Sequence, residues 1–438
     1  MKRLRLSLLV AALVTTLAVG CTRDPGEVVR FMIWGSPDEI QVVQGYLIEF
    51  RKAHPEIAVQ VEHAPSMGYS QKLSTLVRGG NVPDVLYVNE GDVPWLVQQR
   101  ALLDLAPFAK RDAAEVQLDD LYPLAQSPFR KGEATYGVCK DFTTLVLYYN
   151  RDLFDAWDMP YPKAGWTWDD FRATAERLTR RDRGQWGFLL ETWPEELYPW
   201  IWQPGATIAQ DDPPRWLMGT PEQVDAAAEG LQFLADLIWH DDPARRVTPS
   251  PSMTRDQAGN ALFLRGQAAM CTYGRWACMD FKNISAFDWD AVELPRHPRG
   301  GRGTTTFSVA YSVGAATALP EQSWTLVKFL TSRKAQEAVA HSGQAIPSRR
   351  SVAESDAFLR PRALLERGIS IDSRPFVEQV AVGRLKPMFL TAPEAKFAFQ
   401  TGIEPLWNGT RRDARALLLE LQPRIEALVA TDPALRRP

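Results

Sequence analysis

Apolar and polar positions in the first part of the chain alternate between the spacing of strands and the spacing of helices. Residues 28–34 (VVRFMIW) form a short apolar run that ends at Gly-Ser-Pro, which predicts a buried strand followed by a loop. Residues 39–55 carry apolar side chains at helical spacing. A strand, a helix and a third strand are then predicted at 56–64, 68–83 and 84–89. This order favours an α/β fold with a parallel sheet, in which ligands bind beyond the carboxyl ends of the strands.

The later patterns predict further strands and then mostly helices. A β-rich run covers 143–149, and Thr167 begins a capping pattern for the helix that follows it. Strand-like spacing returns at 301–317. One amphipathic helix is expected over 321–343, and the clearest helix of the C-terminal part is expected over 414–429.

The length and composition of the chain are those of an ordinary globular protein with more than one core. It has 438 residues, 45% of them hydrophobic, and a formal net charge of -3. A chain of this length exceeds what one hydrophobic core usually serves, so two lobes are expected. No stripe of Lys and Arg stands out, which argues against a nucleic-acid partner.

The N-terminus has the layout of a secretory signal. Basic residues at positions 2, 3 and 5 precede an apolar segment at 6–20, and Cys21 follows at once. The segment is about 15 residues long, shorter than the ~20 that a membrane-spanning helix needs. The sequence LAVGC resembles a bacterial lipobox, which implies cleavage of the signal peptide 1–20, a lipid anchor to the cell membrane on Cys21 and a tether at 21–27. A plain signal peptide followed by a chance cysteine is the alternative. Either places the mature protein outside the cytoplasm.

The mature chain holds three cysteines besides Cys21, namely Cys139, Cys271 and Cys278. Outside the cytoplasm an odd number means one pair and a free thiol, or no pair at all. Cys271 and Cys278 are near enough in sequence to pair, and the sequence leaves this open. Their spacing to the nearby His297 fits no zinc site, and no metal or other cofactor is expected.

Five stretches, taken in order along residues 31–352, carry a resemblance to a known family. They are WGSPDEIQVVQGYLIEFRKAHPEIAVQVE, YSQKLSTLVRGGNVPDVLYVN, YGVCKDFTTLVLYYNRDLFD with WTWDDF, FLRGQAAMCTYGRW, and WTLVKFLTSRKAQEAVAHSGQAIPSRRSV. Together they resemble the extracellular solute-binding proteins of ABC sugar importers, the family that contains maltose-binding protein.

The resemblance implies a two-lobed clamp of the periplasmic-binding-protein type II, with a mixed α/β layer in each lobe and the ligand cleft at the hinge. Lobes are expected at 28–141 plus 304–360 and at 142–303 plus 361–438. The implied function is the reversible binding of a carbohydrate and its delivery to the membrane subunits of an ABC permease. The 15 tryptophans favour an oligosaccharide, because flat rings stack on sugar faces. Such a protein is not an enzyme, and it is expected to act as a monomer.

A carbohydrate site needs flat aromatic faces and planar polar groups that bond to hydroxyls. Trp276 is the strongest candidate, since the neighbouring Gly274 permits a tight turn that would bring the ring to the cleft. Asp141 lies where the family places an acidic sugar ligand, although Cys139 and Lys140 replace the more usual Leu-Pro before it. The other candidates follow predicted strands or belong to aromatic patches: Trp34, Ser36, Glu39, Asn89, Glu90, Trp193, Trp200, Arg275 and Phe307.

Each candidate also has a purely structural interpretation. The tryptophans could be core residues, Asn89 and Glu90 could cap a helix, and Asp141 could be the ion-pair partner of Lys140. Arg275 could be a surface charge rather than a group that binds a hydroxyl or the carboxylate of an acidic sugar.

Other functions stay open. An anchored carbohydrate-active enzyme, a glycoside hydrolase or lyase, would need two cleft carboxylates about 5 to 10 Å apart. Glu39, Glu90 and Asp141 are the candidates, whereas the adjacent Glu195 and Glu196 are expected to be solvated. A binding protein that feeds a sensor kinase is a further alternative. The sequence does not name the ligand, and polyols, glycerol-phosphate esters and amino sugars stand beside oligosaccharides.

Overall fold

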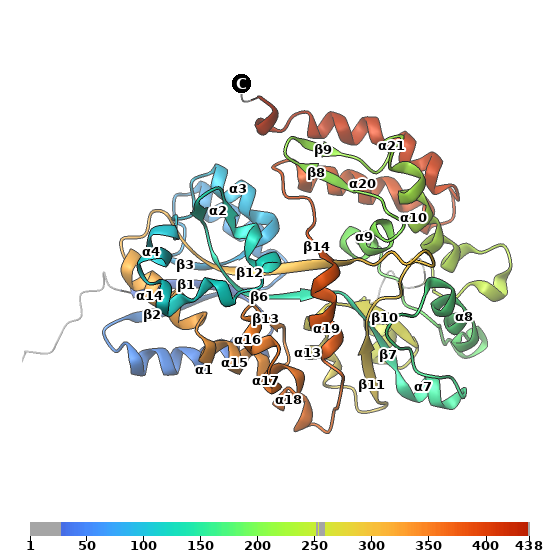
Figure 1. The fold of residues 1–438 in the computed structure, drawn as a ribbon, viewed down its shortest axis with the longest axis horizontal. Helices are drawn as coiled ribbons and strands as arrows, with labels where there is room; N and C mark the ends of the chain where they lie inside the picture. Colours follow the sequence, from blue (N-terminus) through green and yellow to red (C-terminus); the bar gives the residue numbers. More distant parts are fainter. Residues whose placement is uncertain (1–27, 251–252, 254–258, 437–438) are drawn as a thin grey trace, which may run out of the picture.

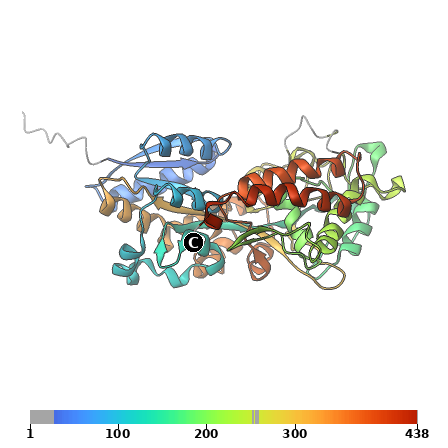
Figure 2. The same ribbon diagram turned by 90° about the horizontal axis from the view of Figure 1, so that it is seen from above.

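The computed structural model describes residues 28–250, 253 and 259–436. The predicted signal peptide, the lipidation site Cys21 and the tether lie outside the described residues. Two α/β bodies lie side by side, and long strands run from one to the other (Figures 1 and 2). We refer to the body built on the larger sheet as the first lobe and to the body that carries the C-terminal helices as the second lobe. This confirms the predicted two-lobed α/β fold.

The first lobe is built on a seven-stranded sheet. Its strands lie in the order β13-β6-β12-β3-β1-β2, and β14 pairs with β12. The parallel part consists of the predicted opening strands, β1 (Val28–Trp34), β2 (Ala58–Ala64) and β3 (Val85–Asn89). The antiparallel part is formed by β6 (Val138–Thr144), β12 (Thr304–Val313) and β13 (Ile346–Pro347). The carboxyl ends of β1 and β3 therefore meet at one edge of the sheet.

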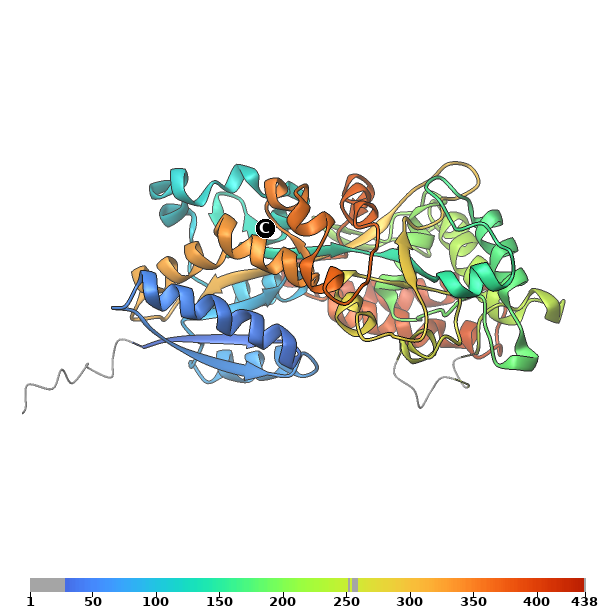
Figure 3. The ribbon, with the colours of Figure 1, turned by 90° about the horizontal axis from the view of Figure 1, so that it is seen from below.

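Helices cover this sheet where the sequence predicts them, with one exception. The helices α1 (Pro37–Ala53) and α2 (Tyr69–Arg78) follow β1 and β2 and end near the predicted residues (Figure 3). The prediction of a single helix over 321–343 is wrong, because the chain forms two helices there, α14 (Pro320–Leu330) and α15 (Arg333–Ser342). The hydroxyl of Ser332 accepts a hydrogen bond from the Ala335 amide at 3.3 Å and so starts the second helix.

The second lobe is built on a smaller antiparallel sheet. Its strands lie in the order β10-β7-β11, with β7 at Val146–Asn150, β10 at Met270–Tyr273 and β11 at Trp289–Val292. Around it pack the longer helices α8 (Trp168–Leu178), α9 (Pro194–Trp202), α10 (Val224–Trp239), α20 (Ala392–Trp407) and α21 (Ala414–Val429). The helix over 414–429 has the predicted bounds, and Thr167 caps α8 as expected.

Within the part of the chain that the structure describes, three segments connect the lobes. The β-rich run expected at 143–149 is divided, since β6 ends at Thr144 and β7 begins at Val146 in the other sheet. β12 brings the chain back, and β14 (Gly383–Arg384) pairs with its first residues before the chain continues to α20 (Figure 1). These crossings place the end of each sheet next to the other lobe.

The three described cysteines are free and buried, so Cys271 and Cys278 form no disulfide in the structure. Within the described residues, none of the helices has both the length and the apolar composition needed to cross a bilayer.

Candidate functional site

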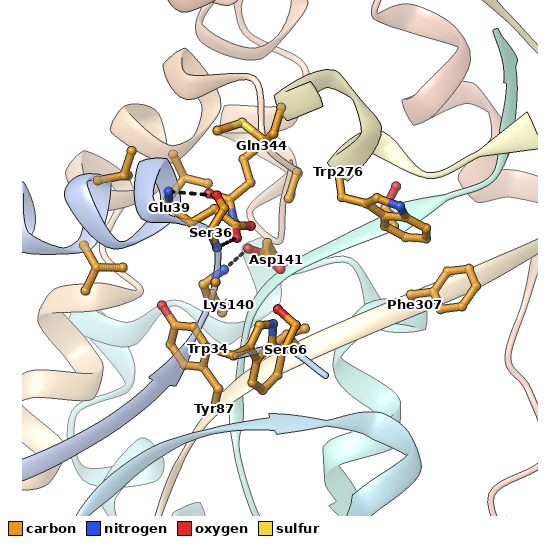
Figure 4. Close-up of a pocket in the computed structure, with 18 of the residues that line it drawn as sticks. Trp34, Ser36, Glu39, Ser66, Tyr87, Lys140, Asp141, Trp276, Phe307 and Gln344 are labelled. Atoms are coloured by element: carbon orange, nitrogen blue, oxygen red, sulfur yellow. Dashed lines mark hydrogen bonds and ion pairs between the residues drawn. The ribbon is translucent and has the colours of Figure 1, made fainter. Parts of the chain in front are cut away.

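A cavity of about 600 Å³ lies between the two lobes. One wall comes from the loops that follow β1, β2 and β3, the base from β6 and β12, and the opposite wall from the turn after β10 (Figure 4). Most of the predicted site residues line it, namely Trp34, Ser36, Glu39, Asn89, Asp141, Trp276 and Phe307. The lining also includes polar and aromatic side chains that were not predicted, namely Tyr46, His63, Ser66, Tyr87, Lys140, Asp280 and Gln344.

The start of α1 places a carboxylate on the cavity wall. Ser36 is the N-cap of α1, and Glu39 completes a capping box, since its Oε2 accepts a hydrogen bond from the Ser36 amide at 2.5 Å. The other carboxylate oxygen of Glu39 accepts a hydrogen bond from the Gln344 side chain (Figure 4). A Cβ on Gly35, whose φ is 151°, would lie 2.9 Å from the Glu39 side chain, so glycine is required for this approach.

A β-bulge in β6 turns two consecutive side chains toward the cavity. Along β12, Val309 pairs with Asp141 and Ala310 pairs with Cys139, so Lys140 has no partner in the ladder. Neighbouring residues of a regular strand point to opposite faces. The bulge overrides this rule, and both Lys140 and Asp141 line the cavity.

Lys140 and Asp141 form a buried ion pair at the base of the cavity (Figure 4). The Lys140 ammonium also lies 5.0 Å from the centroid of the Tyr87 ring, a cation–π contact. Burial acts to lower the pKa of Lys140, but the charge and hydrogen bond of Asp141, together with the nearby Tyr311 and Glu39, outweigh burial and leave this pKa raised. Lys140 is therefore protonated at neutral pH, and the ion pair presents donor and acceptor groups to the cavity.

Aromatic rings from both lobes face the same space. Trp34, on the first lobe, packs edge-to-face on Tyr87 with ring centroids 5.1 Å apart. Trp276, on the second lobe, stands perpendicular to Phe307 at 5.2 Å and is 36% exposed. A Cβ on Gly274 would lie 2.2 Å from the Trp276 ring, so this glycine lets the ring fold back over the turn. A large apolar side chain with this exposure in a cavity is typical of a binding surface.

Other predicted site residues lie outside the cavity. Glu90 is fully buried on the far side of the β3 end, and its Oε1 is 3.0 Å from Nζ of Lys386. Trp200 is a core residue of the second lobe that stacks on Phe233 at 5.4 Å. Trp193 packs against Phe307 at 5.7 Å without lining the cavity. Trp193 therefore supports a cavity-lining ring, whereas Trp200 and Glu90 contact Phe233 and Lys386.

Arg275 also lies away from the cavity. It is fully buried beneath the turn, where its Nε donates to the carbonyl of Gly343 at 3.1 Å and its Nη1 donates to Ser373 Oγ at 3.0 Å. The surface position considered for it is therefore wrong, and because the side chain is fully buried its guanidinium does not reach the cavity. It instead bonds the turn beside Trp276 to the segment after α15.

The expectation that Glu195 and Glu196 are solvated is wrong. Both side chains are buried, in the first turn of α9. Glu195 pairs with Lys396 at 2.7 Å, whereas both carboxyl oxygens of Glu196 lack a hydrogen-bond partner. Burial raises the pKa of Glu196 well above its usual range. The helix packs against β12, where the Thr305 hydroxyl donates to the Glu195 carbonyl at 2.7 Å, and adjacency in sequence did not indicate this.

The sequence patterns did not identify several of the residues that line the cavity. Lys140 was considered only as a partner for Asp141, because a bulge cannot be read from strand spacing. Tyr87 follows the alternation of β3 and could have been found on the same face as Asn89. His63, Ser66 and Gln344 come from strand ends and loops with no local signal for a site.

Comparison with known proteins supports the resemblance noted in the sequence. A family model described as bacterial extracellular solute-binding protein matches residues 46–364. The galactooligosaccharide-binding protein of Bacillus subtilis is 23% identical over 358 residues, which cover 79% of this chain and 78% of that protein.

Solved structures share the fold. An ABC substrate-binding protein of Listeria monocytogenes, in complex with cycloalternan, matches with a TM-score of 0.79 and 23% identity over 91% of this chain and 98% of that chain. The GacH receptor of Streptomyces glaucescens, solved unliganded and with acarbose, matches with a TM-score of 0.75 and 19% identity over 91% of this chain and 98% of that chain. Since the family model covers most of the described chain and the fold agrees, this chain belongs to the bacterial extracellular solute-binding proteins.

Proposed function

We propose that the chain is the substrate-binding component of an ABC importer, which binds a carbohydrate reversibly in the cavity between its lobes and delivers it to the membrane permease. The observation that carries the proposal is the exposed ring of Trp276, which faces a cavity whose opposite wall holds Trp34 and whose base holds Asp141. Apolar ring faces and hydrogen-bonding carboxylates on facing walls match the two faces of a sugar ring.

The relatives support the same ligand class. The Listeria monocytogenes protein is in complex with cycloalternan, and the GacH receptor is in complex with acarbose. The Bacillus subtilis relative is a galactooligosaccharide-binding protein. We therefore propose an oligosaccharide as the ligand, held by several rings at once.

We propose that the cavity performs no catalysis. Glycoside hydrolysis needs one carboxylic acid to give a proton and one free carboxylate. Glu39 bonds to the Ser36 amide and to Gln344, and Asp141 is paired with Lys140. Glu90 lies outside the cavity and is paired with Lys386. The three carboxylates considered for an enzyme from the sequence are thus engaged in positions that serve structure and binding.

The remaining features follow from the sequence. We propose export by the signal peptide 1–20, a lipid anchor on Cys21 and a short tether at 21–27. We propose that 28–141 plus 304–360 and 142–303 plus 361–438 move as the two lobes, and that the protein acts as a monomer. Closure about the crossing strands would bury the bound sugar.

The test is a thermal-shift screen of the mature protein against neutral oligosaccharides, with chromatography of the sugar afterwards. A ligand at 100 times its Kd stabilises the folded protein by about 2.7 kcal/mol, which is a clear rise in Tm. We expect at least one sugar to raise the Tm and to be recovered intact. Release of a smaller sugar would instead support the enzyme alternative.

The control is a pair of tryptophan variants. Trp276→Ala should abolish the shift and leave the Tm of the free protein nearly unchanged, because its ring is partly exposed. Trp200→Ala should lower the Tm of the free protein, because its ring is in the core. A full shift in Trp276→Ala would remove Trp276 from the site.

A further inference from the structure

The charges of the cavity bear on which carbohydrate it takes. Three carboxylates line it, those of Glu39, Asp141 and Asp280. Among the described residues that line the cavity, Lys140 is the one lysine or arginine, and Asp141 already holds its ammonium. The lining therefore carries an excess of negative charge. A cleft lined by one sign of charge concentrates that sign of potential in its interior.

The cations near the cavity are bound elsewhere. The Arg275 guanidinium is fully buried, lies 4.6 Å from the centroid of the Phe376 ring and donates to the carbonyl of Gly343. Lys282 Nζ is 2.6 Å from Oδ2 of Asp38. Lys386 Nζ is 3.0 Å from Oε1 of Glu90, which offsets its charge, and lies 5.0 Å from the centroid of the cavity-lining Phe307 ring. Lys282 and Lys386 would have to give up a partner, and Arg275 would have to leave a fully buried position, before they could bind an anionic group of a ligand.

An acidic group in this cavity would lose its water without gaining a cation. Removing a carboxylate or phosphate from water is unfavourable unless it is paired, and neighbouring carboxylates would repel it. Neutral hydroxyls meet no such obstacle, because they can donate to Asp141 and Asp280 and accept from Lys140. An ammonium group of an amino sugar would be attracted by the same carboxylates.

We propose that the cavity selects carbohydrates without acidic groups, so that it takes neutral or amino sugars and excludes uronic acids and phosphate esters, with Lys140 limiting its negative charge. This inference rests on the proposed function for its ligand class. Glu39 and Asp280 determine this selection, because no lysine or arginine among the described cavity residues offsets their charges, whereas Lys140 limits it by offsetting the charge of Asp141. Removal of Lys140 would add one unit of negative charge to the cavity.

The first experiment measures the sign of the potential without any sugar. Trp276 is exposed in the cavity, so its fluorescence reports on ions that enter. Quenching by caesium and by iodide is measured at low ionic strength and pH 7.5 for the wild type and for Trp276→Phe, and the difference isolates Trp276. Each quenching constant is divided by that of N-acetyltryptophanamide, because the two ions differ in intrinsic efficiency.

We expect the normalised caesium constant of Trp276 to exceed the iodide constant by about two-fold or more, and the ratio to approach one in high salt. Lys140→Met should raise this ratio, and Asp280→Asn should lower it. Asp225→Asn, on the outer face of the second lobe, is the matched control and should leave the ratio unchanged. An iodide constant equal to or greater than the caesium constant would overturn the proposal.

The second experiment uses trimers that share one linkage and differ in charge. Cellotriose, the glucosamine trimer and the glucuronate trimer are all β-1,4-linked, and maltotriose with trigalacturonate adds an α-1,4 pair. We expect any binding to come from neutral or amino members, with acidic members at least about ten-fold weaker. Equal or tighter binding of an acidic trimer would overturn the proposal.

The quenching experiment and the binding experiment together distinguish a failure of the charge selection from a failure of the proposed function. If no trimer of any charge binds, that result counts against carbohydrate binding, while the quenching ratio still decides the sign of the cavity potential. If neutral trimers bind but iodide quenches Trp276 better than caesium, the proposed function stands and the charge selection fails.

Discussion

Nζ of Lys282 lies 2.6 Å from Oδ2 of Asp38, and this ion pair joins the two lobes through residues that are close in sequence to the cavity residues Asp280 and Glu39. Asp38 is in the first turn of α1, directly beside the Ser36 cap, and Lys282 follows the turn that carries Trp276. The hydrogen bond and the charge of Lys282 together lower the pKa of Asp38. A contact between lobes at this place favours the arrangement that encloses the cavity.

We predict that Asp38→Asn opens the lobes more than it unfolds the protein. Because the Asp38 side chain is 55% exposed, the loss in stability should be below about 1 kcal/mol. The lowered pKa means that the pair stabilises the fold above the ordinary pKa of aspartate and that this contribution is lost as pH falls through the lowered value. Small-angle X-ray scattering of the ligand-free protein at pH 7 should give a larger radius of gyration for Asp38→Asn. Asp225→Asn, which breaks a pair with Arg415 within the second lobe, should not change it; equal effects in both variants would argue against an interlobe role.

The buried pair at the base of the cavity leads to a larger prediction. Lys140→Met leaves the Asp141 carboxylate buried without its counter-charge, which should cost about 3 to 5 kcal/mol of folding free energy. The double variant Lys140→Met, Asp141→Asn should recover most of the loss, because it removes both charges. Urea unfolding at pH 7 measures all three proteins, and a double variant as unstable as the single one would show that Lys140 acts through packing alone.

The same pair predicts a response to alkaline pH. The pKa of Lys140 is raised in the folded protein, so its stabilising contribution is complete below the ordinary lysine pKa of about 10.4 and is lost as pH rises through the raised value. The Tm of the wild type should therefore fall more steeply above pH 10 than the Tm of the double variant. Curves of Tm against pH that stay parallel for the two proteins above pH 10 would contradict this prediction.

Replacing Glu195 or Glu196 by glutamine should change the Tm of the protein in opposite directions. Burial raises the pKa of Glu196, so its charged form destabilises the fold, and Glu196→Gln should raise the Tm at pH 8. The gain should shrink as pH falls to the ordinary glutamate pKa of about 4.3 and below, where the wild-type carboxyl becomes protonated in the unfolded state as well. For Glu195, burial acts to raise the pKa, but Lys386 and Lys396 outweigh burial and leave it lowered. Glu195→Gln should therefore lower the Tm at pH 8, and a rise in both variants would contradict this assignment.

The fold could be predicted from sequence where local spacing and caps determine it. The opening strands and helices, the Thr167 cap and the helix Ala414–Val429 all follow from periodicity and short-range hydrogen bonds. The split of the helix over 321–343 was missed, because Ser332 competes for the backbone within a pattern that stays amphipathic. The division of the run at 143–149 depends on pairing with strands from two different sheets.

The site could be predicted only in part, for a related reason. Trp34, Ser36, Glu39 and Asn89 were found because they follow strands whose carboxyl ends meet. The bulge at Lys140 depends on the register of β12, which is distant in sequence. Arg275 and Trp276 are neighbours in the chain, yet one is fully buried and the other faces the cavity, and only the packing of the turn against Ser373 decides which.

The central claim is that an intact sugar is held between the two lobes, against Trp276 on one side and Asp141 at the base. The most direct measurement is a crystal structure of the mature protein with the oligosaccharide that gives the largest thermal shift. The account predicts an uncleaved sugar in the cavity, with a ring face on Trp276 and a hydroxyl bonded to the Asp141 carboxylate. A sugar bound elsewhere on the protein, or a cleaved product in the cavity, would contradict it.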